Sequence, residues 1–384
     1  MGLPASRQTS LEHELSSEDA LRLNVLMTAN PVQAVRIDTN NMTLHALTEA
    51  GEARVPLHPN CRAEQYLQRV KEFLGGHALG SPGGYPVYLQ RWTRMGQTSD
   101  KNLAALLLLG EPEAVVAVAH APGLTDELAR RAWWCQPTME MARWMLEKEA
   151  VIRGGMGRVL ADFLIEHLAF EENPDNRMHT IRLVLYGRLA DAARLQKLWR
   201  MARQVPYYYI GFLEFMGDEL PEDAPARPLP GALAALVAAG NPYARLYADT
   251  LSANGQTYLM AASEVLQKPS THLVIYALLD AFSRRYQDLG VPLSGKCLEE
   301  LQVQAQALCA NGAQRPAALS EVLDTLPEDR RGIQAMLTLS GLSGKVADPY
   351  LLRSTAVGAL MRRKLEPLVK PIQSEIRFLQ GAAE

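Results

Sequence analysis

The feature that most constrains the fold is a long succession of short amphipathic segments from about residue 98 onward. In segments such as 112–120, 157–169 and 190–203, apolar residues recur at helical spacing, and Gly, Pro or Asn separates one segment from the next. This pattern predicts a mainly α fold. Helices of this length with tight turns are typical of HEAT-like stacked pairs, but no residue-level repeat has a fixed period. A HEAT-like array and an irregular bundle therefore both stay open.

The sequence before residue 98 has a different pattern. The runs QAVRID, MTLHAL and EARVPL alternate in part between apolar and polar residues, and TNN and TEAG separate them as turn signals. They predict an antiparallel meander. Helical periodicity in EDALRLNVLM and RAEQYLQRVKEFLGG predicts one helix before the meander and one after it in the chain. We therefore expect a small N-terminal α+β region.

The length of 384 residues predicts two or three domains. The acidic, proline-rich stretch GDELPEDAPARPLPG is the strongest linker candidate. These signals predict a flexible tail at 1–16, an α+β domain at 17–97, a helical domain at 98–216, a linker at 217–231 and a second helical domain at 232–384.

Composition excludes several classes of protein. The formal net charge of -3 is too small and of the wrong sign to attract nucleic acid or an anionic membrane to the protein as a whole. The four cysteines form no CxxC pair and no regular framework, which favours a reducing compartment. The first residues lack the pattern of a signal peptide, and the longest apolar runs are too short to span a bilayer. We expect a cytoplasmic protein without membrane insertion, and the sequence does not indicate its oligomeric state.

The segment LGSPGGYPVYLQRWTRMGQ, residues 79–97, interleaves aromatic residues with arginine after a glycine-proline elbow. Its glycines could bring backbone N–H groups around an anion, but the lysine and following helix of a phosphate loop are missing. A structural turn leading into an edge strand is the preferred interpretation. Aromatic and arginine side chains are enriched in interfaces and also stack on bases. The candidate partner-binding residues here are Tyr85, Tyr88, Arg91, Trp92 and Arg94.

The densest positive charge lies in DAARLQKLWRMARQ. On a helix its cations lie away from the apolar stripe, which predicts an amphipathic helix with a basic face. A basic face of this kind commonly contacts only solvent. The functional alternative is that it binds an acidic protein or RNA. The residues of this second candidate surface are Arg194, Lys197, Arg200 and Arg203.

Cys135 is the one candidate for covalent chemistry. It follows Arg130 and Arg131 in LARRAWWCQP, and a thiol beside cations can have a lowered pKa. A buried packing cysteine is the preferred interpretation, and a reactive thiol is the alternative. No GxSxG, Walker A, GxGxxG or HExxH pattern occurs in the sequence. We therefore expect no catalytic residue, metal site or cofactor.

Three blocks of this sequence also resemble a known family. They are EDALRLNVLMTANPVQAVRIDTNNMTLHALTEAGEA, the segment 79–97 quoted above, and LLLLGEPEAVVAVAHAPGLTDELARRAWWCQPTMEMARWMLE. Together they are similar to the sulfur-reduction protein DsrS family, which is encoded with the dissimilatory sulfite reductase cluster of sulfur-oxidising bacteria. The resemblance is densest over 17–215. It implies a soluble cytoplasmic accessory to the oxidation of stored sulfur and assigns no catalytic residue.

Residue chemistry and resemblance together favour a non-enzymatic accessory or regulatory protein. We expect sulfur-oxidation proteins as partners, bound through the aromatic and arginine surfaces. Two alternatives stay open. One is a sulfur-handling or redox protein that uses Cys135 as a reactive thiol, and the other is an RNA-binding post-transcriptional regulator.

Overall fold

The computed structural model describes residues 15–29, 31–79, 100–286, 293, 295, 297–310 and 314–381, with side chains in these ranges except at 79, 100 and 101. The five candidate residues between 85 and 94 lie outside the described residues. By its internal contacts the chain divides into an N-terminal unit, Met1–His167, and a C-terminal unit, Leu168–Glu384.

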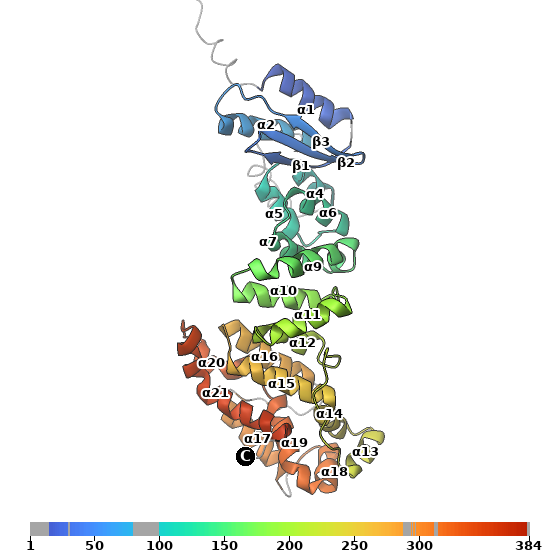
Figure 1. Ribbon diagram of the computed structural model, residues 1–384, viewed down its shortest axis with the longest axis vertical. Helices are drawn as coiled ribbons and strands as arrows, with labels where there is room; N and C mark the ends of the chain where they lie inside the picture. The colour runs from blue at the N-terminus through green and yellow to red at the C-terminus, as the bar shows by residue number, and fades with distance from the viewer. Residues whose placement is uncertain are drawn as a thin grey trace, which may run out of the picture. The chain divides into compact units, whose positions relative to one another are not determined.

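The N-terminal unit combines helices with three strands (Figure 1). Its described elements are, in chain order, α1 (Ser17–Ala29), β1 (Val32–Asp38), β2 (Thr43–Thr48), β3 (Gly51–Pro56), α2 (Ala63–Leu79), α4 (Asp100–Leu106), α5 (Pro112–His120), α6 (Asp126–Cys135), α7 (Met139–Leu146), α8 (Glu149–Ile152) and α9 (Gly155–His167).

The strands form an antiparallel meander in the order β1-β2-β3, which confirms the prediction from the three alternating runs. Leu44 of β2 lies opposite Ile37 of β1 and Val55 of β3. The turn after β1 is fixed by Asp38, whose carboxylate accepts a hydrogen bond from the backbone N–H of Asn40 at 2.9 Å. An Asx turn of this kind reverses the chain locally, and it accounts for the turn that the run TNN predicted at residues 39–41.

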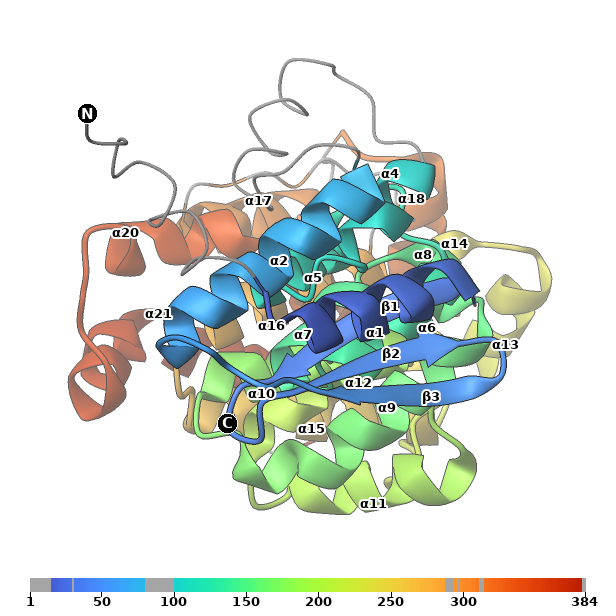
Figure 2. The ribbon, with the colours of Figure 1, turned by 90° about the horizontal axis from the view of Figure 1, so that it is seen from above.

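Helices cover both faces of the sheet. Figures 1 and 2 show α1 and α2 on one face, where Leu23, Leu44 and Tyr66 belong to one buried cluster. On the opposite side α6 packs against β1. At the outer edge of β1, the backbone N–H of Val35 donates to the carbonyl oxygen of Leu107 at 2.8 Å.

The outer edge of β3 has a different character. Within the described ranges, no backbone hydrogen bond joins this edge to another segment. The strand exposes Glu52 and Arg54 and ends at exposed Pro56. Charged residues and proline are common on strands that border solvent.

A buried carboxylate fastens α1 to the segment before α2. Asp19 is fully buried on α1 and accepts hydrogen bonds from the His58 backbone N–H at 2.6 Å, His58 Nδ1 at 2.9 Å and the Tyr66 hydroxyl at 2.5 Å. Burial by itself raises the pKa of Asp19, but the hydrogen bonds from His58 and Tyr66 outweigh it and hold the pKa below its ordinary value. The satisfied carboxylate therefore has a structural role.

The C-terminal unit is built from helices in its described residues (Figure 1). They are α10 (Pro174–Tyr186), α11 (Ala192–Ala202), α12 (Tyr209–Phe215), α13 (Gly231–Ala238), α14 (Pro242–Leu251), α15 (Ala253–Gln267), α16 (His272–Tyr286), α17 (Leu298–Cys309), α18 (Ala317–Thr325), α19 (Arg330–Ser340), α20 (Asp348–Leu351) and α21 (Gly358–Leu379), with short 3-10 turns between some of them.

The segment 217–231 differs from the linker that we expected. The backbone N–H of Leu220 donates to Asn254 Oδ1 at 3.0 Å, and that of Ala224 donates to Thr257 Oγ1 at 2.7 Å. The segment is thus tied to α15 by side chains that accept from its backbone. Helices α10 and α12 on its N-terminal side pack against α16, so the division between units falls at residue 167 instead, inside the expected 98–216 domain.

The mainly α class with a small N-terminal α+β region is confirmed. The HEAT-like repeat stays a prediction. None of the described helices combines the length and the apolar character that a bilayer span requires.

Candidate functional site

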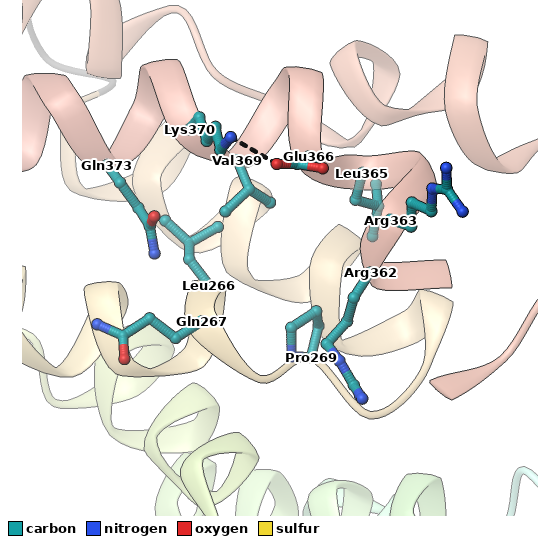
Figure 3. A pocket seen from close by; sticks show the side chains of 10 residues that line it. All are labelled: Leu266, Gln267, Pro269, Arg362, Arg363, Leu365, Glu366, Val369, Lys370 and Gln373. Carbon is teal, nitrogen blue, oxygen red and sulfur yellow. Dashed lines mark ion pairs between the residues drawn. The ribbon is translucent and has the colours of Figure 1, made fainter. Parts of the chain in front are cut away.

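A groove between the C-terminal end of α15 and the side of α21 is the candidate site. Its volume is about 360 Å³. Figure 3 shows two glutamines at one end and two arginines at the other, with apolar side chains between them. The lining residues are Leu266, Gln267, Pro269, Arg362, Arg363, Leu365, Glu366, Val369, Lys370 and Gln373.

Helix α21 presents the groove because its residues segregate by helical spacing. One stripe is buried where the helix packs against α15 and α19. Arg362, Glu366 and Lys370 recur every four residues and are exposed, so they follow one another along the side of the helix. The buried stripe consists of Met361, Leu365, Leu368, Ile372, Ile376 and Leu379.

The charges of the groove are only partly compensated. Lys370 Nζ lies 2.5 Å from Glu366 Oε1, and this hydrogen bond holds the pKa of Glu366 below its ordinary value. Arg362 runs beside Pro269 in Figure 3, whereas Arg363 points away from the groove. Among the described residues, no hydrogen bond or ion pair within 4 Å engages either guanidinium. Two exposed cations are therefore available to a ligand.

The same stretch of chain carries a second hollow, of about 620 Å³, around α20. Its one acidic lining residue, Asp348, already accepts a hydrogen bond from the Tyr276 hydroxyl at 3.0 Å. Leu352, which lines it, is 73% exposed. We call residues 345–370 the C-terminal basic surface, because Asp348 and Glu366 are its only acids against Lys345, Arg353, Arg362, Arg363, Lys364 and Lys370.

The basic face that the sequence predicted on α11 has the expected orientation. Leu198 and Trp199 are buried, and Lys197, Arg200 and Arg203 are exposed. The apolar stripe and the cations therefore lie on different sides of this helix, as its periodicity indicates.

The cations of α11 have partners of their own, however. Arg203 Nη2 donates to both carboxylate oxygens of Glu222, at 2.6 and 2.9 Å, and Arg194 Nη1 lies 2.6 Å from Asp191 Oδ2. The Nε–H of Arg200 donates to the carbonyl oxygen of Gln196 at 3.3 Å. Much of the predicted positive charge is compensated within the C-terminal unit.

Cys135 lies in an environment that disfavours a reactive thiol. Its Sγ donates to the carbonyl oxygen of Val35 at 3.6 Å, and burial raises its pKa to about 12. The cation that opposes this shift is Arg36, which stacks 4.6 Å from the ring centroid of Trp134.

The two arginines next to Cys135 in the sequence are engaged elsewhere. Arg130 and Arg131 both pair with Glu127, at 2.7 and 2.8 Å. These hydrogen bonds, that of Arg130 first, lower the pKa of Glu127 to about 2. Sequence proximity to Cys135 therefore indicated the wrong cation.

The described residues hold no group of three or more His, Cys, Asp or Glu side chains with the geometry of a metal site. Comparison with family models, with curated protein sequences and with solved structures finds no match for this chain.

Sequence analysis did not single out the α15–α21 groove. Its local signal is the run MRRKLEPLVK at 361–370, which puts cations and leucines on one helix. The opposite wall is Leu266 to Pro269, about a hundred residues earlier, so only the fold brings the two walls together.

Proposed function

We propose that this protein acts by binding, as a non-enzymatic accessory protein, and that the α15–α21 groove receives an acidic segment of a partner protein. The observation that carries the proposal is an apolar floor bordered by Arg362, with exposed Arg363 next to it on the same helix. Among the described residues, neither guanidinium makes a hydrogen bond or an ion pair within 4 Å. Arginine forms charge-assisted, often bidentate hydrogen bonds with carboxylates, and apolar side chains supply the area that such a contact buries.

A protein is favoured over RNA as the occupant. None of the ten described residues that line the groove is aromatic, whereas single-stranded RNA commonly stacks its bases on aromatic side chains. Exposed Leu352, Val357 and Leu360 on the C-terminal basic surface add apolar anchors that a protein segment would bury. A partner segment with leucine-like and acidic side chains fits this chemistry.

The resemblance to the DsrS family supplies the cellular setting of the proposal. We propose a cytoplasmic accessory or regulatory role in dissimilatory sulfur oxidation, with a protein of that system as the partner. The groove and the resemblance are independent lines of support, since the similarity is densest before residue 216 and the groove lies after it.

The test compares three immobilised proteins in a nuclease-treated lysate of a sulfur-oxidising bacterium that expresses the dissimilatory sulfite reductase cluster. They are the unchanged protein, the Arg362→Glu/Arg363→Glu variant of α21, and the matched Lys197→Glu/Arg200→Glu variant of α11. We expect an acidic sulfur-oxidation protein to bind the first and third. The α21 variant should bind it at least about tenfold more weakly, because a hydrogen bond to a charged group contributes about 1.5–3 kcal/mol.

Circular dichroism of each variant shows whether its helices are intact. A partner that all three proteins retain equally would contradict the groove as the interface, and so would the absence of any protein partner. If only the α11 variant lost the partner, the interface would lie on α11 instead of the groove. A partner that binds only in a parallel lysate without nuclease would identify RNA instead.

A further inference from the structure

A separate cavity of about 390 Å³ lies in the C-terminal unit, on a different face of α14 from its buried residues. It is formed by α14 together with the turn after α13, the end of α16 and the segment that follows α12. Four of its lining residues are charged, and the others are small or apolar. They are Asp218, Val237, Gly240, Pro242, Arg245, Leu246, Asp249 and Arg285.

Helix α14 contributes one cation and one anion to this cavity. Arg245 and Asp249 are four residues apart and so lie on one side of the helix. In the part of the chain that the structure describes, no hydrogen bond or ion pair within 4 Å engages either side chain. Partial desolvation raises the pKa of the Asp249 carboxyl, although the charges of Arg285 and Arg245 oppose it. The exposed Asp249 carboxylate thus has two cations nearby but no direct partner among the described residues, which leaves its oxygens open to a ligand ammonium.

The second cation of the cavity, Arg285, is fixed by contacts outside the cavity. Arg285 is 8% exposed, its guanidinium lies 4.4 Å from the ring centroid of Tyr258, and its Nη1 donates to the carbonyl oxygen of Gly217 at 3.0 Å. Its carboxylate partner is Asp218, at 3.4 Å, and the Asp218 side chain is 96% exposed. A ligand carboxylate could replace so exposed a partner with little rearrangement.

The wall that carries Asp218 is itself fixed. Asn254 Nδ2 donates to the carbonyl oxygen of Gly217 at 2.6 Å, and Asn254 Oδ1 accepts from the backbone N–H of Leu220 at 3.0 Å. The segment that resembled a linker in the sequence thus closes one side of the cavity. A cavity with pre-positioned walls loses little entropy when a small ligand binds.

We propose that this cavity binds a free α-amino acid, with the ligand carboxylate on Arg245 and Arg285 and the ligand ammonium on Asp249. Its volume lies in the range of small-molecule sites. A simple anion would meet the Asp249 carboxylate, and a simple cation would meet two guanidinium groups. A zwitterion satisfies both signs at once.

The experiment measures the melting temperature of the full chain with each standard amino acid in turn. Three variants accompany it: Arg245→Ala, Asp249→Asn, and Glu328→Gln as a control at an exposed carboxylate outside the cavity. A ligand at about 100 times its Kd stabilises the folded state enough to raise the melting temperature by several degrees. We expect at least one amino acid to do so with the unchanged protein and the Glu328→Gln variant.

Both cavity variants should lose this rise in melting temperature. The Asp249→Asn variant should otherwise melt no lower than the unchanged protein, because the carboxylate it removes has no described partner. The same amino acid without its ammonium group should give no rise. A rise that survives either cavity substitution, or no rise with any amino acid, would overturn the proposal. Neither result depends on the α15–α21 groove or its partner.

Discussion

Helices α11 and α21 both carry a run of exposed cations, but they differ in what surrounds those cations. Around α11, Arg194 and Arg203 pair with carboxylates of the same unit. On α21, Arg362 and Arg363 have no such partner among the described residues. A partner that binds at α11 has to replace existing ion pairs, whereas one that binds at α21 does not. The number of cations in a sequence segment is therefore a poor measure of how many are available.

The origin of the acids explains why the sequence indicated α11. Asp191 stands three residues before Arg194 and also caps the helix by accepting from its backbone N–H, so this pair was visible locally. Glu222 is 19 residues from Arg203, in the segment expected to be a linker. Only the fold of that segment brings the carboxylate to α11.

The largest effect on stability should come from a buried carboxylate of α12 that engages arginines of α10 and α16. Glu214 is 1% exposed and accepts from Arg182 Nε at 2.6 Å and from Arg284. Glu214→Gln should lower the free energy of unfolding by about 3 kcal/mol, because two partly buried guanidinium groups lose their counter-charge. Urea denaturation followed by circular dichroism measures this difference.

The matched control is Glu219→Gln. Glu219 pairs with Arg188 at 3.4 Å, and both side chains are about two-thirds exposed. Its loss should change the free energy of unfolding by no more than about 0.5 kcal/mol. Equal effects of the two substitutions would show that burial does not distinguish these pairs.

A smaller difference in stability compares one cation of α11 with one cation of α21. Arg203→Ala should lower the free energy of unfolding only slightly, by less than Glu214→Gln does, because it removes a two-point contact with Glu222 at the surface. Arg362→Ala should leave it unchanged, since that side chain has no described partner. Denaturant midpoints at neutral pH measure both. If Arg362→Ala were the more damaging substitution, Arg362 would be engaged in the free protein and unavailable to a partner.

The smallest effect is the pH dependence of the Arg203 contribution. The hydrogen bond from Arg203 holds the pKa of Glu222 below its ordinary value. A carboxyl with a lowered pKa in the folded state stabilises the protein above its unfolded-state pKa, and this contribution disappears as pH falls through the folded-state value. The difference in stability between the unchanged protein and Arg203→Ala should therefore be full at neutral pH and shrink below about pH 4. A difference that stays constant down to pH 3 would mean that the ion pair with Glu222 is not its source.

The sequence predicted those parts of the fold that depend on local patterns. The meander follows from three alternating runs and their turn residues, and the orientation of α11 follows from its helical spacing. Contacts between distant segments were not accessible in this way. Cys135 illustrates the limit, because the cation that influences its pKa is Arg36, about a hundred residues away, and not its sequence neighbours Arg130 and Arg131.

The same limit applies to both proposed sites. The groove requires α15 and α21 to meet, and the α14 cavity requires the segment 217–231 to fold back along α15. The composition of that segment, rich in proline and acidic residues, is typical of linkers. Its side-chain acceptors, Asn254 and Thr257, are ordinary residues of a later helix, and nothing in their sequence marks them as anchors.

The border strand β3 has a consequence for how copies of this protein behave when they are crowded together. A sheet can grow by adding a strand only where backbone groups face outward. At the outer edge of β1, Leu107 already accepts the backbone N–H of Val35, whereas the outer edge of β3 makes no backbone hydrogen bond to another segment in the described ranges. There, Glu52 and Arg54 would bring like charges into register in a parallel stack, and Pro56 has no N–H to donate. The residues of the last strand thus disfavour fibre-like polymerisation at this edge.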